Sequence, residues 1–191
     1  MRVLFLRHGE SAHNVHTGEE RLAEEIGDML TERGRAQATA AGEGLRDFGV
    51  TRLWTSPMRR AAETAEAVGA ALGLEPEPIP YAFEYNRREE FADGIARVRR
   101  LKAHFEAETE EADESDLPLL VTHGIVTRFF LLDTILGDLF TEELKTRMWH
   151  LRSSNCGLTI FEHGEMREPG GAPVVAGWNC VTWMERPWDR P

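Results

Sequence analysis

The stretch Val3-Leu4-Phe5-Leu6-Arg7-His8-Gly9-Glu10-Ser11 decides the fold. Its four successive apolar residues, 3–6, predict a buried strand, and the glycine at position 9 predicts a turn directly after it. An imidazole and a guanidinium therefore stand side by side where a strand ends. In α/β proteins this is the edge of the sheet where reactive side chains are exposed. An Arg-His pair in this place is more often structural than functional, so the interpretation depends on what recurs downstream.

The segment Leu53-Trp54-Thr55-Ser56-Pro57 repeats the order of strand, polar residue and helix start. Ser56 is a favourable N-cap, Pro57 suits the first helical position, and Gly73 suits the end of the helix. Arg60 would then lie in the first turn, where free N–H groups and the helix dipole already attract anions. We interpret Arg60 as a clamp for a phosphate or carboxylate, and the neighbouring Arg59 as an ordinary surface residue.

The segment Leu119-Leu120-Val121-Thr122 predicts another buried strand, which ends at His123-Gly124. The residues that follow, 125–136, have the length and apolar content of a helix. A second histidine is therefore placed at a second junction between strand and helix. Taken alone, such a histidine is more often part of the core than of a site.

The whole chain alternates strands with helices, which predicts an α/β fold: three layers, α/β/α, around a mostly parallel central sheet. We expect strands near 3–6, 50–55, 79–83, 119–122, 158–161 and 174–183. We expect helices near 32–48, 58–72, 88–111 and 125–136, and a shorter one that starts at the Thr141 cap. In such a sheet the ligand lies beyond the carboxyl ends of the strands, which is where His8, Arg60 and His123 fall.

Length and composition agree with a single domain over residues 1–191, with 41% hydrophobic and 29% charged residues. No apolar run approaches the roughly 20 residues that cross a bilayer, and Met1-Arg2 leads into a strand without a signal-peptide pattern. We therefore expect no membrane partner and a cytoplasmic location. Cys156 and Cys180 are too few for a disulfide framework, and we expect both to be reduced.

The net charge of −11 argues against nucleic acid as a partner, because the long-range field repels polyanions. An anionic ligand would need a local cluster of positive charge. Arg7, Arg60 and the two histidines would form such a cluster, and it would act at contact distance, where screening is weakest.

Together these motifs resemble the histidine phosphatase superfamily, the phosphoglycerate-mutase-like group. The resemblance covers nearly the whole chain and rests on four segments in the family's order: Arg7-His8-Gly9-Glu10-Ser11 with Asn14, Leu30 to Ala38, Ser56 to Ala65, and Thr122-His123-Gly124 with Arg128.

The resemblance implies a phosphomonoester hydrolase that acts on a small phosphorylated metabolite. His8 would be the nucleophile and form a phosphohistidine that water then attacks; for this it must be neutral, with one ring nitrogen held by a hydrogen bond. Arg7 and Arg60 would hold the phosphate oxygens. His123, if protonated, would add charge from the opposite side. Asn14 and the N–H of Gly124 are further candidate donors to phosphate.

No cofactor or metal is expected, because two arginines and an imidazolium can neutralise the phosphate. His13 and His16 form a pair without a third ligand, so we do not interpret them as a metal site.

The expected proton donor is Glu84, at the end of the strand after the arginine helix. This chain departs from the family pattern directly after it, with Tyr85-Asn86-Arg87-Arg88 in place of a glycine and a Trp-Glu-Gly-like element. Glu89, Glu90 and Asp93 therefore stay open as alternatives. Residues 84–116 are expected to form a small cap region, and Arg87 and Arg88 could bind a second acidic group of the substrate.

Three alternatives to a phosphatase that acts through His8 remain. A mutase of the phosphoglycerate type would return the phosphate to a second hydroxyl, but mutases have a longer insertion between the acid and the second histidine. A non-catalytic phosphate sensor on the same fold would not need the complete set of His8, Arg7, Arg60 and His123. The spacing from Cys180 to Arg186 fits a cysteine phosphatase loop, but this loop contains no glycine. The oligomeric state stays open, with a homodimer among the options.

Overall fold

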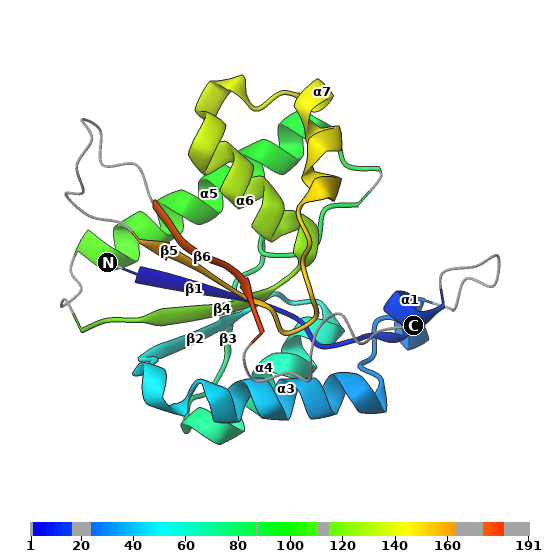
Figure 1. Cartoon of the computed structure of the whole chain (residues 1–191), viewed down its shortest axis with the longest axis vertical. Helices are drawn as coiled ribbons and strands as arrows, with labels where there is room; N and C mark the ends of the chain where they lie inside the picture. The colour runs from blue at the N-terminus through cyan, green and yellow to red at the C-terminus, as the bar shows by residue number, and fades with distance from the viewer. Residues whose placement is uncertain (1, 17–23, 87, 111–114, 163–173, 182–191) are drawn as a thin grey trace.

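The computed structural model describes residues 2–16, 24–86, 88–110, 115–162 and 174–181 (Figure 1). Its strands are β1 Arg2–Arg7, β2 Arg52–Thr55, β3 Glu77–Pro78, β4 Pro118–Thr122, β5 Leu158–Glu162 and β6 Val174–Cys180. Its α-helices are α1 Ala12–Val15, α2 Glu24–Gly27, α3 Glu32–Gly44, α4 Arg59–Leu72, α5 Phe91–Glu110, α6 Gly124–Leu136 and α7 Glu142–Lys145. Short 3-10 helices are η1 Arg46–Phe48, η2 Gly137–Leu139 and η3 Thr146–His150.

The six strands form one sheet in the order β3-β2-β4-β1-β5-β6. The pairs β1–β4, β2–β4 and β2–β3 are parallel, whereas β5 pairs antiparallel with both β1 and β6. The sheet is therefore mixed, with the parallel part that the sequence predicts. Because β1, β2 and β4 are parallel neighbours, the residues that follow them meet at one edge of the sheet.

Helices cover both faces of the sheet, so the predicted three-layer α/β fold is confirmed (Figure 1). Val3 and Phe5 of β1 are buried in the core cluster that contains residues of α5 and α6. Leu4 and Leu6 are buried in the cluster with α3 and α4. Successive residues of a strand point to opposite faces, so a fully apolar strand is what a sheet covered on both sides requires.

The turn after β1 is packed closely between α3 and α4. The Gly9 N–H donates to Thr64 Oγ1 at 3.0 Å, and the Glu10 N–H donates to Gln37 Oε1 at 2.9 Å. A methyl group on Gly9 would collide with the backbone of Gly34, so a side chain at position 9 would push α3 away from the turn. This packing fixes the direction in which His8 leaves the strand.

Two local predictions are wrong. The third strand was expected at 79–83 but is Glu77–Pro78, and the chain turns after Ile79 because Pro80 cannot donate a ladder hydrogen bond. Ser56 was expected as the N-cap of α4, but the N-cap is Met58 and the helix starts at Arg59.

Helix α5 belongs to the sheet-covering layer. Its residues Val98, Leu101 and Phe105 are buried in the core cluster that also contains Phe5 of β1. Whether residues 84–116 also act as a cap over a substrate stays a prediction. Among the described residues no helix combines the length and the apolar content that crossing a membrane needs.

Candidate active site

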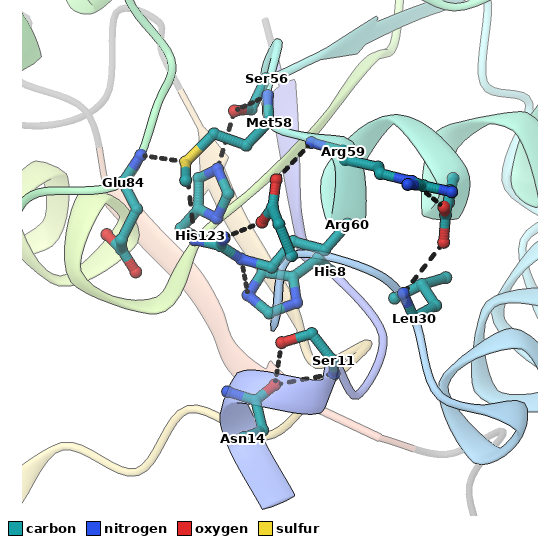
Figure 2. Close-up of polar contacts among 12 residues, drawn as sticks. His8, Ser11, Asn14, Leu30, Ser56, Met58, Arg59, Arg60, Glu84 and His123 are labelled. Carbon is teal, nitrogen blue, oxygen red and sulfur yellow. Dashed lines mark hydrogen bonds and ion pairs between the residues drawn. The ribbon is translucent and has the colours of Figure 1, made fainter. Parts of the chain in front are cut away.

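The predicted site residues come together at one edge of the sheet. His8 follows β1, Ser56 follows β2 and His123 follows β4, while Glu84 lies after β3 (Figure 2). The rings of His8 and His123 are 5.2 Å apart between centroids. Both side chains are buried, with exposed fractions of 2% and 0%.

The hydrogen bonds of His8 define its tautomer. Nδ1 lies 2.7 Å from the carbonyl oxygen of Gly9, and a carbonyl can only accept, so the proton is on Nδ1. Nε2 then carries a lone pair, and it accepts a hydrogen bond from Arg60 Nε at 3.0 Å. Burial lowers the pKa of His8 well below its ordinary value, and the charges of Arg7 and Arg60 lower it further. The imidazole is therefore neutral near pH 7, as a nucleophile must be.

Arg60 is fixed from a second side by Asp28, a residue that the sequence analysis did not single out. Arg60 Nη1 forms an ion pair with Asp28 Oδ1, and the N–H of Arg59 donates to Asp28 Oδ2 at 2.8 Å. The Arg60 side chain is only 9% exposed. The loop before α3 thus holds the arginine of α4 beside His8.

His123 has one partnered and one open ring nitrogen. Nε2 lies 2.7 Å from Ser56 Oγ, which also accepts from the N–H of Met58 at 3.2 Å. The hydroxyl of Ser56 can donate its proton to Nε2, and in that arrangement the ring proton is on Nδ1. Among the described residues the buried Nδ1 has no hydrogen-bond partner. In the arrangement with the proton on Nδ1, this nitrogen is a donor that an anionic ligand would satisfy.

The surroundings of His123 do not favour the expected imidazolium. Burial lowers the pKa of His123 well below its ordinary value, and the positive charge of Arg60 acts in the same direction. A phosphate dianion beside the ring would oppose both effects.

Glu84 lies at the N-terminus of α6. Its carboxylate accepts hydrogen bonds from the N–H groups of Ile125 and Val126, each at 3.2 Å, and from its own neighbour Tyr85 at 3.0 Å. Burial nevertheless raises the pKa of Glu84, against the effect of these N–H groups and of Arg60. A carboxyl group with a raised pKa is suited to carry a proton near neutral pH.

The alternatives to Glu84 are paired or exposed, and Glu90 is among the exposed ones. Glu89 is paired with Arg97 through two hydrogen bonds of 2.7 and 2.8 Å. Asp93 is exposed in the first turn of α5. Arg88 is exposed, and Arg87 lies outside the described residues.

Arg7 and Gly124 border a second positive region beside the histidines. Arg7 Nη1 donates to the carbonyl oxygen of Ser153. A methyl group on Gly124 would lie 3.4 Å from Arg7 Nε, 3.4 Å from Ser153 Oγ and 3.2 Å from Arg128 Nη1. The absence of a side chain at position 124 therefore leaves room between two guanidinium groups.

Asn14 is placed at the rim rather than inside the site. Its Oδ1 accepts from the N–H of Ser11 at 3.1 Å and from Asn155 Nδ2 at 3.0 Å, and the residue is exposed. Asn155 also donates to the carbonyl oxygen of His8 at 3.0 Å. Asn14 thus takes part in fixing the His8 turn, and its direct contact with phosphate stays a prediction.

Sequence reasoning missed Asp28, Asn155 and Ser153, which are brought to the site by loops. Thr64 could have been found, because it lies one helical turn after Arg60 on the same face of α4. It accepts from Gly9 N–H and donates to the Arg60 carbonyl oxygen at 2.6 Å. In the described part of the chain no three His, Cys, Asp or Glu residues gather as metal ligands would.

The cysteine phosphatase alternative depends on residues 180–186. Cys180 is the last residue of β6, while Arg186 lies outside the described residues. Cys156 is buried directly behind His8, where its N–H donates to the carbonyl oxygen of Arg7 at 3.0 Å. Burial raises the pKa of its thiol to about 12, so Cys156 is not a thiolate near neutral pH.

Comparison with known proteins agrees with this geometry. Residues 3–81 match the family model of the histidine phosphatase superfamily (branch 1). The chain is 26% identical to the "Probable phosphoglycerate mutase GpmB" of Erwinia tasmaniensis over 95% of this chain and 92% of that protein. Identity is again 26% to the protein of the same name from Salmonella paratyphi A, over 98% and 96%.

Solved structures with the same fold include a mycobacterial glucosyl-3-phosphoglycerate phosphatase in complex with VO3, with a TM-score of 0.71 and 22% identity over 93% of this chain and 98% of that one. A phosphoserine phosphatase from Entamoeba histolytica has a TM-score of 0.70 and 18% identity over 96% and 99%. The match over residues 3–81 and the curated relatives support the resemblance to the histidine phosphatase superfamily, and the solved structures show the same fold.

Proposed function

We propose that the protein is a metal-independent phosphomonoesterase that hydrolyses small phosphorylated metabolites through a phosphohistidine at His8. The observation that carries this proposal is the arrangement of His8: its Nδ1–H is held by the Gly9 carbonyl oxygen, and its Nε2 lone pair faces Arg60. The names of the solved neighbours, phosphatases of glucosyl-3-phosphoglycerate and of phosphoserine, agree with hydrolysis. We also propose a cytoplasmic location.

In the first step His8 Nε2 attacks phosphorus, and the bond from phosphorus to the ester oxygen breaks. The phosphoryl group replaces the Arg60 N–H as the partner of Nε2. Arg7, Arg60 and His123 Nδ1–H would then hold the phosphate oxygens, with the Gly124 N–H as a further donor. Protonated Glu84 would give its proton to the leaving oxygen, which releases a neutral alcohol.

In the second step a water molecule attacks the phosphohistidine, and Glu84 takes the proton from that water. Inorganic phosphate leaves, and His8 returns to the neutral form with its proton still on Nδ1. The charges needed to stabilise the transferred phosphoryl group come from side chains of this chain, so the proposal includes no metal ion.

The test is to trap the intermediate. With a radiolabelled phosphomonoester, in the presence of a chelator, rapid quenching in alkali should show protein-bound phosphate that is stable to base and labile to acid. His8→Ala should abolish both the label and turnover, whereas His16→Ala, at an exposed histidine, should retain them. Full activity of His8→Ala, or label on a cysteine, would disprove the proposal.

A mutase activity is the second candidate, because the similar curated proteins are described as probable phosphoglycerate mutases. The two activities compete for one intermediate, which either water or a second substrate hydroxyl can attack. With a monophosphoglycerate as substrate we expect release of inorganic phosphate to exceed formation of the positional isomer. Faster isomer formation would favour the mutase and leave the role of His8 unchanged.

A further inference from the structure

Glu84 is carried by a segment that lies beyond the sheet. Strand β3 ends at Pro78, and after it the N–H of Ile79 still donates to the carbonyl oxygen of Thr55 at 2.8 Å. Backbone polar groups past the end of a strand need other partners where they are buried. The position of the proposed proton donor therefore depends on what holds residues 80–84.

Side chains from other elements hold three successive carbonyl oxygens of this segment. Arg97 Nη1, from α5, donates to the carbonyl oxygens of Tyr81 at 3.2 Å and of Phe83 at 2.7 Å. Thr122 Oγ1 donates to the carbonyl oxygen of Ala82 at 3.1 Å. The guanidinium carbon of Arg97 also lies 4.0 Å from the ring centroid of Phe83. Arg97 thus fixes the residues directly before the proposed proton donor.

Glu89 binds the other edge of the same guanidinium. Arg97 Nε donates to Glu89 Oε1 at 2.8 Å, and Arg97 Nη2 donates to Glu89 Oε2 at 2.7 Å. The two side chains are only 9% and 11% exposed. The hydroxyl of Tyr85 donates to the carbonyl oxygen of Glu89 at 2.7 Å. One guanidinium therefore connects residues 81 and 83 with residue 89, and Glu84 lies between them in the chain.

Stability alone does not account for this buried ion pair. Removing two charges from water costs about as much as their attraction returns, so apolar side chains of similar size would stabilise the fold as well. What a planar guanidinium adds is fixed geometry, because its N–H groups bind a carboxylate and two carbonyl oxygens in set directions. Both oxygens of Glu89 are bound by Arg97, so the carboxylate of this alternative proton donor is occupied in the pair.

From these contacts we infer that Arg97, held by Glu89, is a positioning residue for Glu84. It acts through the backbone of residues 81–83 and sets the place from which the Glu84 carboxyl gives its proton to the leaving oxygen. A general acid must lie within hydrogen-bond reach of the oxygen that it protonates, and a displacement of about 1 Å can cost about a hundredfold in rate. The inference rests on the proposed phosphatase function.

The test replaces both members of the pair in the full-length protein. Glu89→Gln combined with Arg97→Met leaves neither charge buried without its partner, which a single replacement would do. We expect kcat for 3-phosphoglycerate to fall by about tenfold to a hundredfold, the scale of a misplaced catalytic group. The kcat for p-nitrophenyl phosphate should change less than about threefold, because nitrophenolate leaves without a proton.

The Glu84→Gln background separates positioning from a structural role. If the pair acts only through Glu84, replacing the pair in Glu84→Gln should not lower turnover of 3-phosphoglycerate any further. A structural role would lower turnover by the same factor in both backgrounds, and that result would overturn the inference.

Arg100→Met is the matched control. Arg100 is exposed on the same helix, and its guanidinium carbon lies 4.2 Å from the ring centroid of Tyr81, but the carbonyl oxygens of residues 81–83 accept from Arg97 and Thr122 instead. Arg100→Met should leave the ratio of the two kcat values unchanged. A selective loss as large as that of the pair variant would assign the effect to stacking on the segment and contradict the role of Arg97.

Arg97→Lys provides a milder replacement. It keeps the charge beside Glu89 but not the planar fork, so we expect a smaller selective loss on 3-phosphoglycerate than in the pair variant. Thermal unfolding of each variant shows whether the fold is retained, and Arg97→Lys carries the test if the pair variant does not fold.

The outcomes separate this inference from the proposed function. Equal losses on both substrates in the pair variant, or no loss on either, overturn the inference while phosphatase activity stands. If the wild type hydrolyses no phosphomonoester, the proposed function fails, and NMR titration of the Glu84 carboxyl still tests the positioning. Burial raises the pKa of Glu84, so releasing its segment should lower that pKa toward its ordinary value, while Arg7 and Arg60 are present in both proteins. An unchanged pKa would overturn the inference.

Discussion

His8 and His123 are the same residue type in nearly the same burial, yet their surroundings prepare them for different tasks. The Gly9 carbonyl leaves His8 with a lone pair on Nε2, whereas the Ser56 hydroxyl can donate to His123 Nε2 and leave a proton on Nδ1. In the proposed reaction one ring attacks phosphorus and the other donates to an oxygen of the same group. These proposed roles depend on single hydrogen bonds behind the rings.

At the same scale, Glu84→Gln tests the proton donor. An alkoxide is a poor leaving group and needs a proton, whereas nitrophenolate leaves without one. We expect turnover of a sugar phosphate or phosphoglycerate to fall by roughly a hundredfold or more, in the range of a lost general acid, and turnover of p-nitrophenyl phosphate to fall much less. Steady-state kinetics with both substrates measures the difference.

The pH profile gives the control for this variant. The proposed reaction needs neutral His8 and protonated Glu84. Activity on the alkyl ester should therefore decline as pH rises through the raised pKa of Glu84, and as it falls through the lowered pKa of His8. Glu84→Gln should lose the alkaline decline and keep the acidic one. Equal losses on both substrates would direct the search to Glu89, Glu90 or Asp93.

Single residues were predictable where a motif joined them to a strand end. Arg7, His8 and His123 each follow a visibly apolar strand, so parallel pairing was enough to bring them together. Asp28 and Asn155 follow no such pattern. They reach the site through loops whose course depends on packing. A single aspartate or asparagine in a sequence does not indicate that its loop will pack against the site.

At the scale of elements, α4 shows that two adjacent residues of one helix can differ in burial and in their partners. Arg60 is buried against His8, whereas the adjacent Arg59 side chain is 52% exposed and paired with Glu63 at 2.7 Å. Arg60→Ala should cost on the order of 3 kcal/mol of transition-state stabilisation, the scale for removing a preorganised donor. Arg59→Ala should change kcat/KM little, because an exposed pair one helical turn apart contributes little.

Measuring kcat/KM of both variants on one substrate tests which face of α4 meets the phosphate. Equal losses at the two positions would contradict the orientation of the helix described above. Arg60→Ala also removes the ion-pair partner of Asp28, so thermal unfolding of the variant shows whether the fold is retained.

Elements were predicted best where periodicity and length agreed, as for α4 and α6. The third strand was predicted at the wrong position. The run of apolar and aromatic residues from Ile79 to Phe83 indicates a strand, but Pro80 cannot donate a hydrogen bond to a neighbouring strand. The start of α4 was predicted too early in the sequence. Ser56 is a favourable N-cap residue, but its hydroxyl forms a hydrogen bond with His123. A side chain with two uses cannot be assigned from local sequence alone.

At the scale of the whole molecule, the buried histidines link stability to pH. Burial lowers the pKa of both His8 and His123 in the folded protein, so below pH 6.5 the unfolded chain binds more protons. Their contribution is present in full above about pH 6.5 and is lost as pH falls toward the folded pKa values. The unfolding free energy should decrease by up to about 1.4 kcal/mol per pH unit for each histidine.

Glu84 acts in the opposite direction, because its raised pKa lets the folded protein bind a proton first, but one carboxyl group cannot offset two histidines. Urea unfolding between pH 7.5 and 5.5 measures the slope. His123→Asn should reduce it, and a wild-type stability that does not change over this range would contradict the burial of neutral histidines.

Helix α6 begins where three parts of the site meet, and this has a consequence for protein engineering. His123 is its N-cap, its first N–H groups bind Glu84, and Arg128 lies on its next turn. A change that tilts α6 would move His123, Glu84 and Arg128 together, so this helix is a poor place to diversify. The segment 149–151 meets the site through Arg128. A library confined to that segment would alter the contacts of Arg128 and leave the hydrogen bonds of His8, Glu84 and His123 unchanged.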